Sequence, residues 1–164
     1  RAFAKPLVAA IDGFALGGGF ELALMADLIV LGETARVGLP ETNLGIMPGA
    51  GGSQRLMALV GRARATRLVM MGEIIDAKTA EAWGIASWRV DGSAVPFAEE
   101  LCGKLAKRAP LSLAASKRAL VMGEEQGLAF AEERQGFEAL LDSADKREGI
   151  AAFRAKRKPE FRGE

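Results

Sequence analysis

The fold class is decided by residues 6–31, which read PLVAAIDGFALGGGFELALMADLIVL. Residues 6–11 form a short apolar run closed by an Asp-Gly pair, which predicts a buried strand followed by a turn. Three consecutive glycines at 17–19 precede a run of strong helix formers, so we expect a helix over residues 18–26. Residues 27–31 have the pattern of the next strand. Strands that alternate with helices in this way predict an α/β fold.

Downstream of this stretch, the pattern alternates less regularly. Residues 40–52 carry four glycines and two prolines, which indicates an irregular loop. A helix should follow, with Ser53 as its N-cap and Gly61 as its break. The remaining elements expected here are an extended piece at 35–39, a second helix at 62–71, a short helix at 77–83 and a strand at 85–90.

The last part of the chain has a helical pattern throughout. It begins at about Val95, and Pro110, the pair Gly123-Glu124 and Asp145 are expected to divide it into roughly four helices. The change of pattern predicts two parts: an α/β core over residues 1–91 and a helical subdomain over residues 92–164.

The chain contains no histidine, and this is its most restrictive compositional feature. Ser-His-Asp and Cys-His catalysis, histidine-ligated zinc and histidine-bound haem are therefore excluded. The 22 Lys and Arg residues nearly balance the 21 Asp and Glu residues, and the net charge of +1 offers no general attraction for nucleic acid. The single cysteine, Cys102, cannot form an intrachain disulfide, and we expect it to be a core residue of a helix.

The start of the chain lacks the pattern of a signal peptide, which predicts a cytosolic or organellar protein. No membrane span is expected, because Glu21 and Asp27 interrupt the longest apolar candidate at 14–29. The first residue is not Met, and the chain opens in a strand-like run. We therefore expect it to be the later part of a longer protein.

The glycine run ALGGGFEL at residues 15–22 is the first candidate functional motif. Glycines at a strand-to-helix turn let backbone N–H groups approach a ligand, and the helix N-terminus adds partial positive charge, which together suit an oxyanion. Glu21 lies three residues after Gly18 and can reach a group bound there. The alternative is a tight structural turn in which Glu21 is an ordinary acid favoured by the helix dipole. The run lacks both the G-x-G-x-x-G pattern and a P-loop lysine, which argues against a nucleotide site.

The stretch GLPETNLGIMPGAGGSQRL at residues 38–56 is the second candidate motif. Glu41 follows an extended segment, where catalytic residues of α/β proteins tend to lie, although a solvent-exposed loop acid fits the same pattern. The glycines from Gly49 to the next helix repeat the anion-binding arrangement of the first motif. Two acids beside exposed backbone donors suit acid–base chemistry next to a stabilised oxyanion, so Glu21 and Glu41 are the candidates for proton transfer.

Three stretches together resemble the crotonase superfamily, and most closely its enoyl-CoA hydratases. They are KPLVAAIDGFALGGGFELALMADLIVL, VGLPETNLGIMPGAGGSQRL and the tail DKREGIAAFRAKRKPEF, and the resemblance runs over residues 5–162. It implies a ββα spiral core, here its C-terminal part, followed by a helical oligomerisation subdomain. It also implies reversible syn addition of water to the C2=C3 bond of a 2-enoyl-CoA thioester.

The resemblance also implies a role for each site residue. Gly18 would supply one backbone N–H of an oxyanion hole, and Glu21 and Glu41 would handle the water as an acid pair. Many relatives with other activities keep only one of these acids, so the presence of both favours hydration. No metal and no redox cofactor is implied, and coenzyme A enters only as part of the substrate.

Substrate binding and assembly are implied in the same way. Gly17, Gly49, Phe137 and Lys156 would contact the acyl-CoA, the last two through its adenine and phosphates. The helical region would form a homotrimer, or a dimer of trimers. The compartment would be the cytoplasm, or the mitochondrial matrix in a eukaryote.

Family members carry a long segment before the matched region, which includes the second oxyanion N–H and much of the coenzyme A pocket. The 164 residues alone are therefore expected to hydrate a substrate poorly. Two alternatives stay open. One is another crotonase-type enzyme such as an enoyl-CoA isomerase, and the other is a truncated, non-catalytic module for acyl-CoA binding or assembly.

Overall fold

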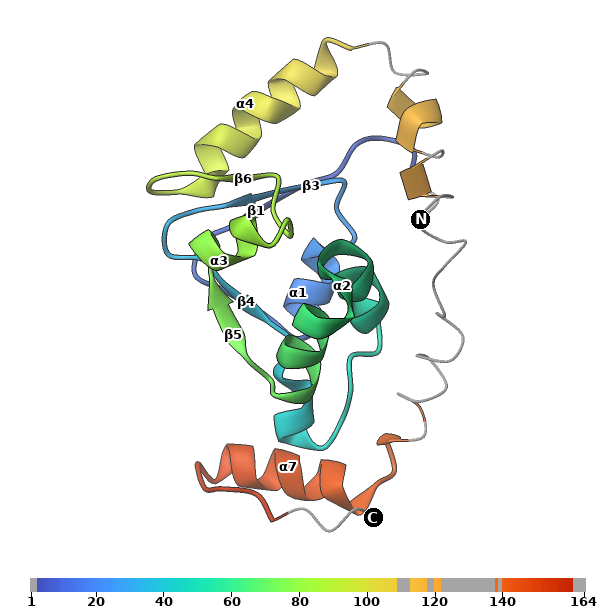
Figure 1. Cartoon of the computed structure of the whole chain (residues 1–164), viewed down its shortest axis with the longest axis vertical. Helices are drawn as coiled ribbons and strands as arrows, with labels where there is room; N and C mark the ends of the chain where they lie inside the picture. Colours follow the sequence, from blue (N-terminus) through green and yellow to red (C-terminus); the bar gives the residue numbers. More distant parts are fainter. Residues whose placement is uncertain (1–2, 109–112, 118–119, 122–137, 139, 161–164) are drawn as a thin grey trace.

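The computed structural model describes residues 3–108, 113–117, 120, 121, 138 and 140–160. Its strands form two three-stranded sheets (Figure 1). The first sheet is wholly parallel, in the order β1 (Val8–Ile11), β3 (Leu28–Leu31) and β6 (Trp88–Arg89). In the second sheet, β2 (Phe14–Leu16) runs parallel to β4 (Arg36–Gly38), and β5 (Ile74–Asp76) runs antiparallel to β4.

The chain winds between the two sheets as a spiral. It passes from β1 to β2 and then through helix α1 (Gly18–Ala23), after which β3 and β4 repeat the same step. Each strand of the second turn pairs with its counterpart in the first, so that Val8 lies opposite Leu28 and Phe14 opposite Arg36. The expected α/β fold with a ββα spiral is therefore confirmed.

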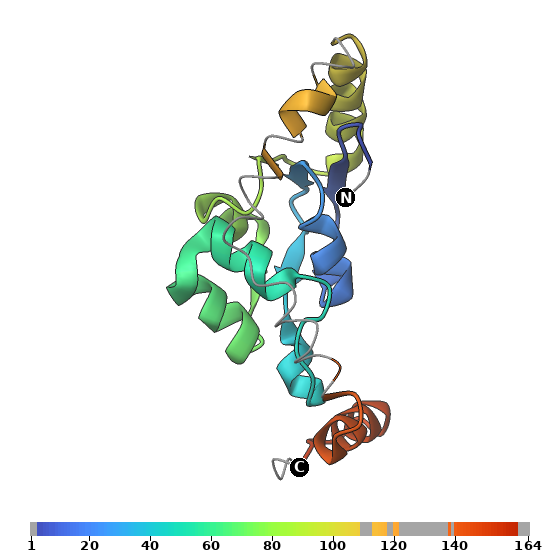
Figure 2. The same cartoon turned by 90° about the vertical axis from the view of Figure 1, so that its right-hand side faces the viewer.

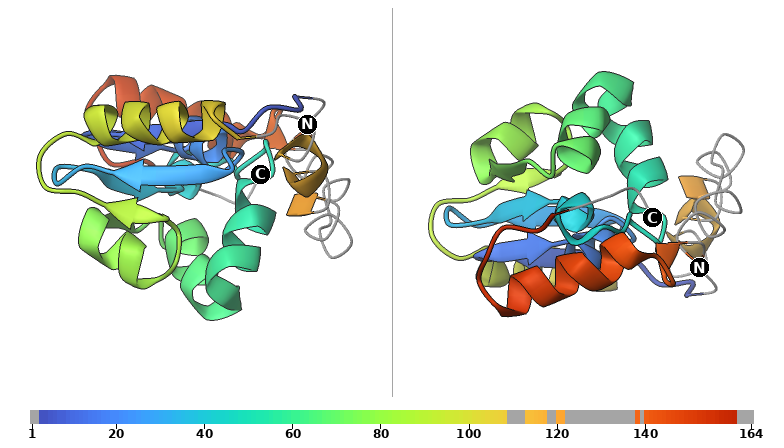
Figure 3. Two further views of the ribbon diagram at one scale, coloured as in Figure 1. Left: turned by 90° about the horizontal axis from the view of Figure 1, so that it is seen from above. Right: turned by 90° about the horizontal axis from the view of Figure 1, so that it is seen from below.

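Helices enclose the strands from two sides. Figure 3 shows α2 (Gly52–Met70) and α3 (Ala77–Ala82) on one side of the strands and α4 (Ala94–Ala106) on the other, whereas α7 (Ala144–Arg154) lies beyond the strands. Figure 2 shows α4 and α7 at opposite ends of the long axis. The main core lies between α1, α2 and the strands, and its largest buried side chains are Phe20, Leu31, Leu39, Leu56 and Leu68. Each contributes about 1.5–3 kcal/mol by burial, which fixes α1 against α2.

The beginning of α2 differs from the sequence prediction. The helix starts at Gly52 rather than after an N-cap at Ser53, and its N-cap is Gly51, whose φ of 90° suits a glycine. The reason is tertiary: the carboxylate of Glu21 accepts hydrogen bonds at this end, as described below. Gly61 interrupts α2 with φ 72° and ψ 165°, so the predicted break is confirmed as a kink.

Three shorter elements were not expected. Strands β2 and β5 have three residues each, too few to produce a recognisable period-2 pattern. The region after Pro40, predicted to be irregular, begins with a 3₁₀ helix, η1 (Pro40–Leu44). The predicted strand over residues 85–90 is reduced to Trp88–Arg89.

Cys102 is exposed on α4, so its prediction as a core residue is wrong. The buried face of α4 is set by Ala94 and Ala98, which are four residues apart and pack with Val30 of β3. The packed stripe continues through Leu101, whereas Cys102 lies on the exposed flank beside it. Among the described residues, no helix is both long enough and apolar enough to cross a membrane.

Helix α7 packs closely against η1. It starts at Ala144, with the Ser143 hydroxyl accepting a hydrogen bond from the backbone N–H of Lys146 at 3.0 Å, so Asp145 lies in its first turn. A Cβ atom added to Gly149 would collide with the backbone of Leu44. The other helix boundaries predicted for this tail, at Pro110 and Gly123-Glu124, lie outside the described residues, and the division at residues 91 and 92 stays a prediction.

Replacement of Gly149 by alanine should therefore destabilise the protein. The added methyl meets backbone atoms that cannot rotate away, and overpacking of this kind costs about 1–3 kcal/mol. Gly103→Ala is the matched control, because a Cβ there meets nothing within 4 Å and alanine favours the helix by about 1 kcal/mol. Urea unfolding of both variants should show opposite changes in the free energy of unfolding. Equal stabilities would contradict the close packing of α7 on η1.

Candidate active site

The glycine turn before α1 joins the second sheet to the first helix. Gly17 is the N-cap of α1, and its φ of 55° lies in the left-handed region that favours glycine. Its N–H donates to the carbonyl oxygen of Gly38 at 3.0 Å and is thus used within the fold. Gly18 begins the helix, where N–H groups have no intrahelical acceptor, and a Cβ there would meet nothing within 4 Å. The backbone at Gly18 can therefore be approached closely by a ligand.

Glu21 is buried in the first turn of α1, and its side chain is 4% exposed. Its Oε1 atom accepts hydrogen bonds from the backbone N–H of Ala50 at 2.8 Å and of Gly52 at 2.9 Å. The sequence suggested that backbone N–H groups of this loop bind an external anion. In the structure, the N–H groups of Ala50 and Gly52 bind the carboxylate of Glu21 instead. These bonds fix the position of Glu21 against the first turn of α2.

Glu41 lies in η1, and its side chain is 8% exposed. Its carboxylate lies against the glycine turn: a Cβ built on Gly17 would be 3.3 Å from the Oε1 atom of Glu41. The structure therefore brings the two sequence motifs together, since the second acid lies beside the turn that starts the helix of the first.

The charged side chains classed as buried among the described residues are Glu21, Glu41 and Arg55. Burying a charge is costly unless it is paired or hydrogen-bonded, and a core formed only for stability avoids it. A group of buried ionisable residues next to an accessible backbone turn is typical of catalytic sites. The burial of Glu41 argues against the reading of this residue as a solvent-exposed loop acid.

Arg55 is the residue that the sequence analysis missed. It lies one turn into α2, and its guanidinium donates to the carbonyl oxygen of Ala50 at 2.7 Å. A signal was present, because the buried positions at the start of α2 are 52, 55, 56 and 60, which follow helical spacing. The other residues on this buried face of α2 are small or apolar. An arginine among them indicates a buried charge that has a specific hydrogen-bond partner.

The other predicted site residues lie elsewhere or cannot be placed. Gly49 is half-buried in the turn immediately before Ala50. Lys156 is exposed just after α7, with φ 52°, and is not among the buried side chains. Phe137 lies outside the described residues. In the described part of the chain, no group of three or more Cys, Asp or Glu side chains is arranged to hold a metal ion.

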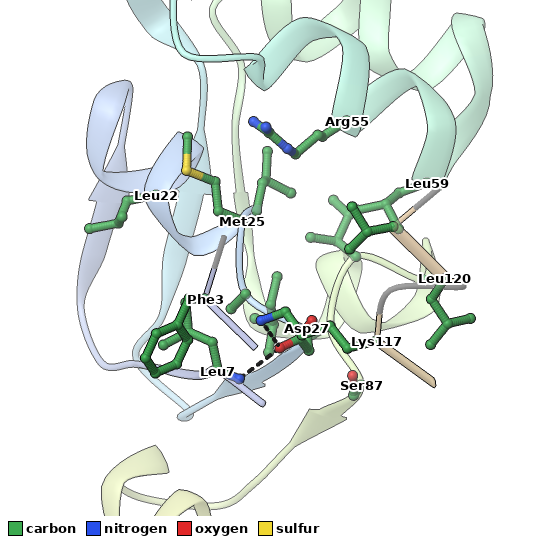
Figure 4. Close-up of a pocket in the computed structure, with 17 residues that line it drawn as sticks. Phe3, Leu7, Leu22, Met25, Asp27, Arg55, Leu59, Ser87, Lys117 and Leu120 are labelled. Atoms are coloured by element: carbon green, nitrogen blue, oxygen red, sulfur yellow. Dashed lines mark hydrogen bonds and ion pairs between the residues drawn. The ribbon is translucent and has the colours of Figure 1, made fainter. Parts of the chain in front are cut away.

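An open cavity of about 620 Å³ lies beside these helices (Figure 4). Its wall includes Leu22 of α1, Met25 just after that helix, and Arg55 and Leu59 of α2. At its other end the Lys117 ammonium and the Asp27 carboxylate form an ion pair at 2.7 Å. Glu21 does not line this cavity. The apolar outer face of α1 therefore faces the cavity, whereas the acid of the same helix is buried inside the protein.

Together these groups can support acid–base chemistry. Two buried carboxyls, one of them fixed by two backbone N–H groups, flank a turn whose first helical residue, Gly18, is exposed and has open space where a side chain would be. A carboxyl at hydrogen-bond distance from a reacting atom can add or remove a proton, and a backbone N–H can stabilise an oxyanion that develops beside it.

Comparison with known proteins identifies a family for the chain. The enoyl-CoA hydratase/isomerase family model matches residues 1–164. The 2,3-dehydroadipyl-CoA hydratase of Escherichia coli (strain K12) is 48% identical over 166 residues, which cover 99% of this chain and 65% of that protein.

Two solved structures show how far the fold extends. An enoyl-CoA hydratase from Mycobacterium avium subsp. paratuberculosis K-10 superposes with a TM-score of 0.92 at 31% identity, covering 97% of this chain and 66% of that one. A methylmalonyl CoA decarboxylase superposes with a TM-score of 0.85 at 29% identity, over 99% of this chain and 65% of that one. The chain thus spans slightly less than two thirds of these relatives. From its glycine turn, its spiral fold and these matches, the chain belongs to the enoyl-CoA hydratase/isomerase family.

Proposed function

We propose that the protein is an enoyl-CoA hydratase, a lyase that reversibly adds water across the C2=C3 bond of 2-enoyl-CoA thioesters. One observation carries the proposal, which is that two carboxyls are buried where the two motifs meet. Glu41 lies against the glycine turn at Gly17, and Glu21 is bonded to the loop at Gly52. Hydration requires both an oxygen nucleophile and a proton for carbon, and two separate carboxyls can serve these needs. The relative from Escherichia coli bears the name of a hydratase.

The mechanism follows from where charge develops. As the water oxygen bonds to C3, negative charge moves through C2 to the thioester oxygen. The N–H of Gly18 would donate to that oxygen, and loss of one such donor elsewhere costs about 2.7–4 kcal/mol. In the proposed division of labour, Glu21 positions and activates the water, and Glu41 exchanges the proton with C2. Glu21 accepts the proton that the water loses as its oxygen bonds to C3, and Glu41 gives a proton to C2. A proton then returns from Glu21 to Glu41, so that one water is added and both carboxyls regain their starting states.

Substrate contacts are part of the same proposal. The acyl-CoA would lie along Gly17 and Gly49 at the loop, with Phe137 and Lys156 near its adenine and phosphates. No metal or redox cofactor is needed for this reaction. The proposed compartment is the cytoplasm, or the mitochondrial matrix in a eukaryote.

The main alternative is an isomerase, or another reaction that stabilises a thioester enolate. The fold does not decide between them, because a methylmalonyl CoA decarboxylase shares it. An isomerase would rely chiefly on one acid, and the burial of both acids here favours hydration. Measuring turnover of 2-enoyl-CoA and of 3-enoyl-CoA separates the two, since a hydratase acts on the first and an isomerase shifts the double bond of the second.

The proposal is tested with two preparations. One is the 164-residue chain alone, and the other is the same chain with the segment that family members carry before it, taken from the Escherichia coli relative and supplied in cis. Hydration of crotonyl-CoA is followed by the loss of enone absorbance, and variants are compared in the faster preparation. If neither preparation hydrates crotonyl-CoA or a longer 2-enoyl-CoA, the proposed function is wrong. Binding and assembly without turnover would favour the non-catalytic module.

We also propose a three-fold assembly, a trimer or a dimer of trimers, formed through the helical tail. Among the described residues there, the large apolar side chains Val95, Leu120, Leu141 and Phe153 are exposed in the single chain, and Phe153 is 73% exposed. Apolar side chains left uncovered on a tail are typical of interfaces. Light scattering at micromolar concentration should give the mass of a trimer or hexamer. A folded monomer at that concentration would contradict the assembly.

A further inference from the structure

Arg55 is a buried cation that the proposed mechanism does not use, and its contacts point to a role. We propose that Arg55 is a positioning residue, which holds the turn at Ala50 and Gly51 so that the flanking N–H groups keep Glu21 in place. The inference rests on the proposed function in one respect: it takes Glu21 to act on the water.

The bonding pattern places Arg55 in the middle of the turn. Glu21 receives the N–H groups of Ala50 and Gly52, which belong to the peptide units before and after the one that joins Ala50 to Gly51. That central unit presents the carbonyl oxygen of Ala50, which accepts from the Arg55 guanidinium at 2.7 Å. The backbone N–H of Arg55 also donates to the carbonyl oxygen of Gly51 at 3.0 Å. The guanidinium therefore holds the central peptide of the turn through the carbonyl oxygen of Ala50, whereas the bond to Gly51 is an ordinary backbone bond of α2 that any residue at position 55 would make.

The burial of Arg55 supports a specific role. Its side chain is 5% exposed, although guanidinium groups are strongly favoured in water. Figure 4 shows the Arg55 side chain at one end of the group of residues that line the cavity. Gly51 has a φ of 90°. Because glycine has no Cβ atom, little resists rotation of the peptides on either side of it. A turn of this kind needs an external bond to stay in one orientation, and Arg55 supplies it.

Arg55→Met keeps the length of the side chain and removes its donors. The central peptide can then rotate, and the two N–H groups no longer hold the Glu21 carboxylate. A misplacement of about 1 Å in a catalytic group can cost roughly 10²-fold, so kcat should fall between about tenfold and 10²-fold while KM changes little. Arg62→Met is the matched control, because Arg62 is an exposed arginine of the same helix. Its kcat should stay at the parent value.

A double-mutant cycle with Glu21→Gln separates positioning from a merely structural role. If Arg55 acts through Glu21, the Arg55→Met loss should largely disappear when Glu21 has already been replaced. The same fold loss in both backgrounds would overturn the inference. Arg55→Lys provides a variant that keeps the positive charge and a single donor group, the ammonium. It should retain the fold and lose several-fold in kcat, and an unchanged kcat in a folded Arg55→Met variant would contradict the role.

A measurement independent of turnover completes the test. Amide hydrogen exchange of the full chain should show faster exchange at Ala50 and Gly52 in Arg55→Met than in Arg62→Met, because the first variant frees the turn. Unchanged protection at both amides would overturn the inference whatever the enzyme does. Conversely, full activity of Glu21→Gln would refute the proposed role of Glu21 and leave the exchange result standing, so the two failures can be told apart.

Discussion

Glu41→Gln should lower the hydration rate by about 10²–10⁴-fold, the range typical of general acid–base groups. Glutamine keeps the shape of the side chain and loses the titratable proton. Glu41 is buried against the glycine turn, where the reaction is proposed to occur. Substrate binding should change little, because the role proposed for the carboxyl is proton exchange with C2. The expected pattern is therefore a low kcat with nearly constant KM.

Glu33→Gln is the control for this result, since Glu33 is an exposed acid on the loop after β3. It should turn over substrate at the parent rate. A large loss in both variants would indicate a general effect of charge on activity. A small loss in Glu41→Gln, with the fold intact, would remove Glu41 from the mechanism.

Gly52→Ala should lower kcat by roughly 10²-fold through displacement of Glu21. A Cβ atom on Gly52 would lie 2.7 Å from the Cγ atom and 2.8 Å from the Oε1 atom of Glu21, which is too close for either to remain in place. The carboxylate must therefore move away from the two N–H groups that hold it. A displacement of about 1 Å in a reacting group is sufficient for a loss of this size.

Gly103→Ala serves as the control here too, because a methyl group there meets open space. Both variants should be folded by circular dichroism. Their rates should differ by about two orders of magnitude. Equal rates would show that the contact between Gly52 and Glu21 has no bearing on catalysis.

The strands and the helix at the start of the chain could be predicted, because their local sequence patterns are strong. The apolar runs that became β1 and β3, and the glycine run that became the start of α1, each carry a distinctive pattern. Strands β2 and β5 were not predicted, because each is a short segment that is fixed as a strand by its pairing with β4, a tertiary effect. Cys102 was misplaced for a related reason: its helix was recognised, but which face would pack depends on the strands beneath α4.

The two acids of the candidate site could be predicted from the sequence, but the residues that they contact could not. Glu21 and Glu41 stand out because each follows a glycine- or proline-marked turn, and the structure buries both. The sequence could not show that Ala50 and Gly52 donate to Glu21, because these residues are 29 and 31 positions away from it. For the same reason Ser53 was expected as the cap of α2, while the structure satisfies that end of the helix partly with the Glu21 carboxylate. The catalytic roles of the two acids stay predictions.

The central claim is that Glu21 and Glu41 act together on one water, and a double-mutant cycle of crotonyl-CoA hydration tests it most directly. The rates to compare are those of the parent, Glu21→Gln, Glu41→Gln and the double variant, each from the loss of enone absorbance. We predict that each single variant loses at least about 10²-fold and that the double variant is little worse than the poorer single one, because residues that act as a unit are not additive. Rates within a few-fold of the parent in both single variants would contradict the account.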